Sequence, residues 1–264
     1  MTGGPTSKAQ SVLRPSWQAP ASVSAFTTTR DGGTSDGHYG LADGSPVGLN
    51  LGLRCGDDPL RVHENRRRLR SWLPAEPHWM NQVHGNAVWQ PGDPAVDAGR
   101  VPIADAAVTD RRAQVLVVLS ADCLPVFFCD LDGSAVGIAH AGWRGLAGGV
   151  LENTVSALRY LRPSAAGWLA HLGPAIGPAS FEVGPDVVAA FCDQDAGSAG
   201  AFVPTGRADK CWGNLYALAR RRLAAVGIEQ VTGGDCCTVI DAGRFYSHRR
   251  DRGSGRMASL IWLA

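Results

Sequence analysis

Three short apolar segments follow one another closely in the middle of the chain, at residues 113–119, 125–129 and 135–139. Short apolar runs bounded by turn residues are typical of buried strands. No helix fits between them, so several strands must be adjacent in the sequence. Strands and helices alternate only partly along the rest of the chain. This pattern predicts a layered α+β domain with a mixed sheet and argues against a doubly wound fold.

Other elements follow from local signals. Asp58 and Pro59 are typical of a helix start, and we expect the cluster 66–68 to lie on the solvated face of that helix. Residues 31–48 are rich in Gly, Asp and Ser and predict a long loop. We expect residues 1–20 to form a flexible tail and 21–264 a single domain, since no repeat or linker divides them. Further strands are predicted at 23–30 and 257–263, and helices from 58 to 70 and at 145–161, 185–191 and 212–226.

Composition narrows the class of protein. The 264 residues are 45% hydrophobic, enough for a substantial core, and carry a formal net charge of only +1. Broad binding to nucleic acid or to anionic membranes needs a basic excess, so neither partner is expected. No apolar run reaches the roughly 18 residues of a membrane span, and no signal-peptide pattern is present. Seven cysteines without a repeated spacing predict reduced thiols in a cytoplasmic protein.

Three residues stand out as candidates for chemistry. His140 follows an apolar strand and precedes a glycine-flanked turn into a helix, a position where α/β proteins place reactive groups. Cys123 lies in a similar place, in the segment ADCLP. His84 lies in NQVHG. Two imidazoles and a thiolate suit Zn²⁺, and three protein ligands leave a fourth position for water or substrate.

The spacing of these residues matches no compact zinc-finger pattern, so two other interpretations stay open. The cysteine could be buried and the histidines merely hydrogen-bonded. Alternatively, Cys123 could be a thiolate nucleophile with a histidine as its base.

Several arginines could bind an anion. Arg144, close to His140, could hold a phosphate or carboxylate in its planar fork, or pair with a nearby acid. Arg249 and Arg250 lie in FYSHRRD, which mixes aromatic and cationic residues before the last strand. Such a mixture fits a surface that stacks on rings and binds anions. The segment GPAIGP predicts a rigid loop that either approaches a ligand or simply turns the chain.

Taken together, these motifs resemble the YfiH family of laccase-domain proteins, whose members have been called multicopper polyphenol oxidases and purine nucleoside phosphorylases. The resemblance runs from about Phe26 to Leu263. It is carried by the segments NQVHG, ADCLP, AHAGWRG, GPAIGP with the following FEVG, and FYSHRRDRGSGR, and also by TTTRDGG, GLNLG and the stretch from GDDP to NR that ends at Arg66.

The resemblance implies a three-layer α/β/α fold of α+β type with a zinc site made by His84, Cys123 and His140. It also implies phosphorolysis of adenosine, inosine and methylthioadenosine, and deamination of adenosine. Alternatives are a peptidoglycan-editing amide hydrolase that uses Cys123 or zinc-bound water, and a copper polyphenol oxidase. Copper is therefore the second candidate metal, although a multi-electron copper centre needs more histidines than this set supplies.

For phosphorolysis the expected partners are a purine nucleoside and phosphate. We expect Cys123, His140 and Arg144 to be the catalytic residues, with Arg144 as the phosphate clamp and Arg249 or Arg250 assisting. The sequence departs from the family pattern in three places: Asn214 stands where relatives often have Asp, His248 replaces a common Tyr, and the region 38–47 is longer. These departures bear on substrate preference more than on catalysis.

Overall fold

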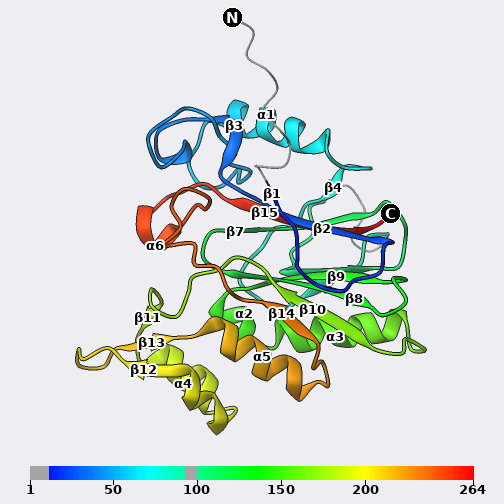
Figure 1. The fold of residues 1–264 in the computed structure, drawn as a ribbon, viewed down its shortest axis with the longest axis vertical. Helices are drawn as coiled ribbons and strands as arrows, with labels where there is room; N and C mark the ends of the chain where they lie inside the picture. The colour runs from blue at the N-terminus through cyan, green and yellow to red at the C-terminus, as the bar shows by residue number, and fades with distance from the viewer. Residues whose placement is uncertain (1–11, 93–99) are drawn as a thin grey trace, which may run out of the picture.

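The computed structural model describes residues 12–92 and 100–264. Its centre is two β-sheets packed face to face (Figure 1). On one outer side lies α1 (Pro59–Arg70), and on the other lie α2 (Trp143–Ala147), α3 (Val150–Leu161) and α5 (Leu215–Ala225). The five-stranded sheet has the order β1 (Val12–Leu13), β2 (Val23–Thr28), β15 (Met257–Leu263), β7 (Val115–Ser120) and β4 (Pro77–His78). The six-stranded sheet has the order β14 (Val231–Gly233), β10 (Trp168–Leu172), β8 (Leu124–Asp130), β9 (Val136–Ala141), β6 (Ala106–Thr109) and β5 (Val88–Trp89).

The central strands are apolar throughout because they are buried on both faces. On β7, Leu116 and Val118 face the six-stranded sheet, whereas Val115 and Val117 pack toward the side of α1 (Pro59–Arg70). The same alternation runs along β8, β9 and β15. The α+β class and the mixed sheets are confirmed. In the expected α/β/α layering, the central β layer consists of two sheets.

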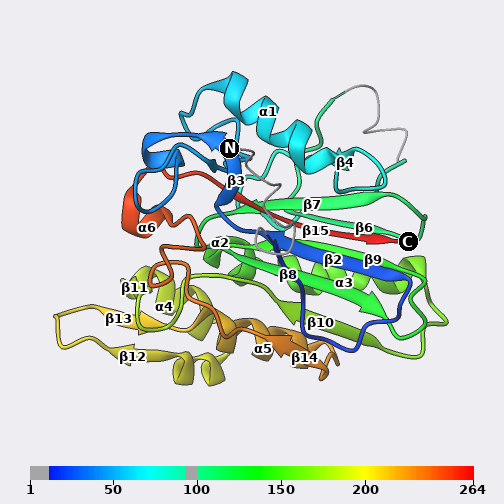
Figure 2. The same cartoon turned by 45° about the horizontal axis from the view of Figure 1, so that its top comes forward.

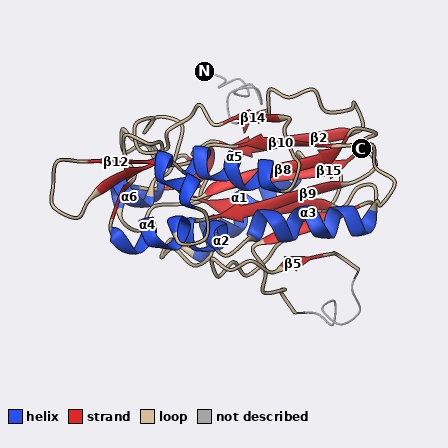
Figure 3. Cartoon of the chain, turned by 90° about the horizontal axis from the view of Figure 1, so that it is seen from below, coloured by secondary structure: helices blue, strands red, loops and turns tan. Residues whose placement is uncertain are grey.

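Helices and a small third sheet complete the fold. Viewed from below, α2 (Trp143–Ala147), α3 (Val150–Leu161) and α5 (Leu215–Ala225) lie across the six-stranded sheet (Figure 3). The third sheet has the order β11 (Glu182–Val183), β13 (Cys211–Gly213) and β12 (Phe202–Pro204), next to α4 (Pro185–Cys192) and the 3₁₀ helix Ala196–Ala201. Within the described ranges, no helix is both long and apolar enough to cross a membrane.

Several predicted boundaries differ from the structure for local reasons. The expected helix 145–161 is interrupted between α2 and α3, where Gly149 has a left-handed φ of 89°. The expected helix from 212 begins only at Leu215, because 211–213 form β13; Asn214 caps it by accepting a hydrogen bond from the amide of Ala217.

The expected loop 31–48 contains β3 (Asp31–Ser35) and a 3₁₀ turn (Gly37–Tyr39). The expected tail also differs: 12–13 form β1, and Trp17 packs against the core between the sheets. Residues 1–11 lie outside the described residues. The start of α1 is as predicted, with the Asp58 carboxylate accepting a hydrogen bond from the amide of Leu60. All seven cysteines are free thiols, also as predicted.

Segments from the early and the late part of the described chain lie side by side next to the sheets. The loops around β3 lie next to α6 (His248–Asp251) and the start of β15 (Figure 2). Backbone hydrogen bonds join them, from the amide of Arg30 to the carbonyl of Arg244 and from the amide of Leu51 to the carbonyl of Arg256. Segments from the early and the late part of the sequence therefore together form one side of the candidate site described below.

Candidate metal centre

The structure brings together the three residues singled out from the sequence. His84 lies in the loop between β4 and β5, Cys123 in the turn that joins β7 of one sheet to β8 of the other, and His140 on β9. Their ligand atoms all lie within 4.8 Å of one another, and the two imidazole ring centres are 4.9 Å apart. A single cation could contact all three.

One buried carboxylate positions both histidines. Asp105 is fully buried, and its Oδ1 lies 2.9 Å from Nδ1 of His140, so Nε2 of His140 is left for a metal. The same carboxylate accepts hydrogen bonds from the backbone amides of Val83, His84 and Gly85 at 2.8–3.1 Å. These bonds hold His84 at a left-handed φ of 61°, which costs about 1–2 kcal/mol for a residue with a Cβ. A carboxylate behind a ligating histidine is a common metal-site arrangement.

Two glycines of the AHAGWRG segment let the backbone approach the site. A Cβ on Gly142 would lie 2.9 Å from Cδ2 of His84 and 3.0 Å from Sγ of Cys123. A Cβ on Gly145 would lie 2.6 Å from the carbonyl oxygen of Gly85. Any larger residue would push the His84 loop away from Cys123.

The electrostatics favour a thiolate. Burial opposes ionisation of Cys123, but the charges and hydrogen bonds of His140 and His84 outweigh it and lower the pKa of the thiol to about 6. Burial likewise lowers the pKa of His140, yet the Cys123 thiolate and the Asp105 hydrogen bond raise it to about 9. Near neutral pH the metal-free site is thus a thiolate–imidazolium pair. One thiolate and two imidazoles fit zinc.

These two shifts predict how zinc affinity depends on pH. Between about pH 6 and pH 9 the metal-free pair holds one proton, on His140, which zinc must displace. We expect the apparent affinity to rise about tenfold per pH unit across this window, and more steeply below pH 6, where the thiol is also protonated. Competition titrations with a chelator at several pH values measure this slope; an affinity that is flat between pH 6 and 9 would contradict the pair.

A cavity of about 440 Å³ opens beside the three residues. Its lining includes Arg54, Arg66 and Arg256, and none of its described lining residues is an aspartate or glutamate. Arg66 is fixed, because it lies 3.7 Å from the ring centre of Trp79 and donates two hydrogen bonds to the carbonyl of Leu51. The cavity therefore suits an anionic or phosphate-bearing ligand next to the metal site.

The arginines predicted from the sequence lie elsewhere. Arg144 is exposed, with its guanidinium 4.3 Å from the ring centre of Trp143. Arg249 donates to the carbonyl of Glu182, and Arg250 donates to backbone carbonyls and to Asp251. None of the three predicted arginines lines the cavity.

Other residues at the cavity and the cluster were not expected there from the sequence. Arg66 was expected on a solvated helix face, a description that fits only its neighbours, whose ion pairs to Glu64 are at the surface. Arg54 and Arg256 carried a weak signal, since they lie in or next to the segments GLNLG and RDRGSGR. Asp105 carried no such signal in the sequence.

The comparisons with known proteins agree with this geometry. The family model described as multi-copper polyphenol oxidoreductase laccase matches residues 24–264. The chain is 46% identical to the purine nucleoside phosphorylase YfiH of Escherichia coli, over 96% of this chain and 98% of that protein. It is 47% identical to a purine nucleoside phosphorylase of Xylella fastidiosa, over 96% of each chain.

Solved structures show the same fold. A Neisseria meningitidis protein, NMB0706, superposes with a TM-score of 0.86 at 45% identity, covering 96% of this chain and 99% of that one. YlmD of Geobacillus stearothermophilus superposes with a TM-score of 0.82 at 31% identity, covering 98% of both chains. The chain thus has the fold of these proteins, and the family model covers it almost from end to end. It belongs to the YfiH family.

Proposed function

We propose that the protein is a zinc-dependent purine nucleoside phosphorylase. The observation that carries this proposal is a cavity with three arginines and no described carboxylate, directly beside a site of two histidines and a cysteine. Relatives at 46–47% identity are named purine nucleoside phosphorylases, which supports the same class of reaction here.

His84, Cys123 and His140 would hold the zinc ion, which when bound supplies a Lewis acid toward an oxygen of the substrate. The chain's own residues do the rest. Arg54, Arg66 and Arg256 bind phosphate and orient it toward the ribose, since a guanidinium matches phosphate in shape and charge. Arg66 is the most rigid of the three because Trp79 and the Leu51 carbonyl hold it.

The residues that line the cavity also bear on whether the protein deaminates adenosine. Zinc deaminases use a glutamate to move protons, and no acidic residue lines the described part of the cavity. The cavity thus favours phosphorolysis as the main reaction, with deamination as a side activity to be measured. The thiolate–imidazolium pair favours one further candidate, amide hydrolysis with Cys123 as nucleophile in the metal-free chain.

Product analysis separates these reactions. Zinc-loaded protein is incubated with inosine and with adenosine, with and without inorganic phosphate. We expect free base and ribose 1-phosphate only when phosphate is present. Inosine formed from adenosine without phosphate would indicate deamination, and no product from either nucleoside would reject the proposal. Oxygen uptake with a phenol by copper-loaded protein tests the oxidase alternative.

The arginines provide a matched test of phosphate binding. Replacing Arg54 or Arg256 by Ala should raise the KM for phosphate about 10- to 100-fold, because one charge-assisted hydrogen bond contributes about 1.5–3 kcal/mol. Arg144→Ala is the control, since Arg144 lies outside the cavity. A larger KM change in Arg144→Ala than in Arg54→Ala or Arg256→Ala would indicate that phosphate binds at Arg144, as predicted from the sequence, and not in the cavity.

A further inference from the structure

Phosphorolysis needs a proton for the departing purine, and the cavity offers few donors. Among its described lining residues, the imidazole and thiol groups that could donate a proton belong to three histidines and two cysteines. His84, Cys123 and His140 form the metal centre. Cys55 already donates to the carbonyl of Gly52 at 3.0 Å. His248 is the remaining group.

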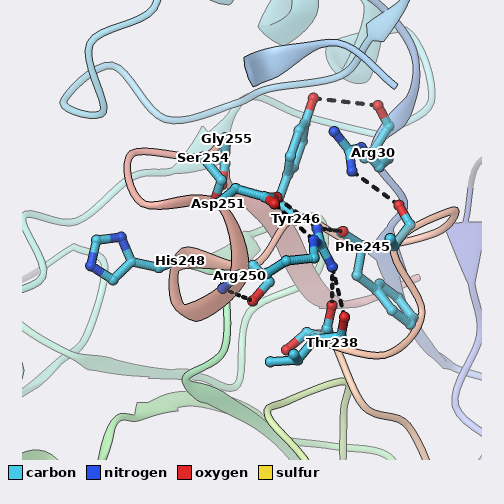
Figure 4. A network of polar contacts seen from close by, with 12 residues as sticks. Arg30, Thr238, Phe245, Tyr246, His248, Arg250, Asp251, Ser254 and Gly255 are labelled. Carbon is cyan, nitrogen blue, oxygen red and sulfur yellow. Dashed lines mark hydrogen bonds and ion pairs between the residues drawn. The ribbon is translucent and has the colours of Figure 1, made fainter. Parts of the chain in front are cut away.

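The short helix α6 that begins with His248 is firmly anchored (Figure 4). Its cap is Ser247, whose Oγ accepts a hydrogen bond from the amide of Arg250. Arg250 donates to the carbonyls of Thr238, Val239 and Phe245 at 2.8–3.0 Å. Figure 4 shows the ring of His248 directed away from this network. Arg250, predicted to bind phosphate, instead fixes the helix that presents His248.

A second set of contacts ties α6 to the metal centre. Asp122, next to Cys123, is buried and holds a left-handed φ of 89°. Its carboxylate accepts hydrogen bonds from the amide of Arg249 at 2.7 Å and from Oγ1 of Thr238 at 2.5 Å. The turn that carries Cys123 and the helix that carries His248 therefore share one carboxylate, which fixes the place of His248 relative to the site.

Nε2 is the ring nitrogen of His248 that makes no hydrogen bond within the described residues, whereas the amide nitrogen of Gly253 lies 3.5 Å from Nδ1. Only the imidazolium form can give up a proton to a leaving base, and in that form Nδ1 also carries a proton and no longer accepts from Gly253. His248 is exposed and lines the cavity, so a bound base can reach it.

We propose that His248 is the general acid that protonates the leaving purine, an assignment that rests on the proposed phosphorylase function. An oxygen of hydrogen phosphate forms a bond to C1′ of the ribose while the C1′–N9 bond breaks and its electron pair passes to the base. The proton moves from Nε2 of the His248 imidazolium to N7, which leaves a neutral ring with its remaining proton on Nδ1. The products are the neutral purine and ribose 1-phosphate, and the imidazole regains its proton from solvent.

Charged groups surround His248 from several elements. Arg54 and Arg66 face the cavity from the loop after β3 and from α1, and Arg256 precedes β15. On its own helix and just after it lie Arg249, Arg250, Asp251 and Arg252. The metal centre and Cys55 complete the titratable groups of the described lining. Bound phosphate would offset the positive charge that these arginines bring.

The test compares two substrates. Inosine must be protonated as its base leaves, whereas 7-methylinosine already carries a positive charge on the base and needs no acid. We expect His248→Gln to lower kcat for inosine about 10²-fold or more, and to change kcat for 7-methylinosine less than about threefold. The matched control is His63→Gln, since His63 is exposed on α1 outside the cavity and should leave both rates unchanged. Zinc content is measured in every sample.

A conservative variant gives a second readout. His248→Tyr should keep more inosine turnover than His248→Gln, because a phenol can also donate a proton and an amide side chain cannot act as an acid. Equal losses on both substrates, or no loss on either, would overturn the assignment. If the zinc-loaded parent protein splits neither nucleoside, the proposed function fails, and this assignment with it.

Discussion

Replacing Cys123 by Ala is expected to remove the bound metal and to lower nucleoside turnover about 10³-fold or more. In the proposed centre the thiolate supplies the one anionic ligand. Zinc sites contribute about 10–16 kcal/mol of binding free energy with full ligand sets, so losing the charged ligand leaves a weak pair of histidines. Elemental analysis and product formation measure the two effects in one sample.

The control for this variant is Cys192→Ala, at the end of α4 and outside the cavity, which should keep both zinc and activity. Zinc retained at one per chain in Cys123→Ala would show that the cysteine is not a ligand. Full activity in chelator-treated parent protein, lost in Cys123→Ala, would instead identify a metal-independent thiol nucleophile.

Replacing Asp105 by Asn is expected to weaken zinc binding about 10- to 100-fold, the usual cost of removing a carboxylate behind a ligating histidine. The amide has one acceptor oxygen where the carboxylate has two, so the Nδ1 proton of His140 and three backbone amides compete for it. Unsatisfied buried donors also cost about 1–3 kcal/mol each. Zinc titration and chemical unfolding record the two effects.

The variant Asp130→Asn separates the effect on zinc binding from the effect on stability. Asp130 is equally buried and accepts hydrogen bonds from the backbone amides of Ser134 and Ala135, but it lies at the far end of β8 from Cys123. We expect a similar loss of stability with zinc affinity unchanged. If both variants lose zinc equally, Asp105 acts through general stability and not by positioning His84 and His140.

Two of the proposed metal ligands, Cys123 and His140, lie where local signals are strong, whereas no local signal marks His84, and the zinc site as a whole was implied by the resemblance to the family. Cys123 follows an apolar strand and precedes a proline, and His140 stands before a glycine-flanked turn. Asp105 could not be predicted in the same way. It lies between apolar residues next to β6, a strand that the analysis did not predict, and only tertiary structure places it behind His140.

The arginines proposed to bind phosphate show the other limit. Arg54, Arg66 and Arg256 come from three separate segments, and no local pattern says that they share a cavity. Arg250 looked equally suitable in sequence, but the fold places it outside the lining of the cavity, where it binds the carbonyls of Thr238, Val239 and Phe245. The pairing of two sheets in the β layer could not be predicted for a related reason. A strand that is buried on both faces is a continuous apolar run, whether a helix or a second sheet packs on it.

X-ray absorption at the zinc edge of the purified protein tests the metal centre most directly. The account predicts one zinc per chain, with one sulfur neighbour at about 2.3 Å and two imidazole nitrogens at about 2.0–2.1 Å. A zinc spectrum without a sulfur neighbour, or with two or more, would contradict a centre built from His84, Cys123 and His140.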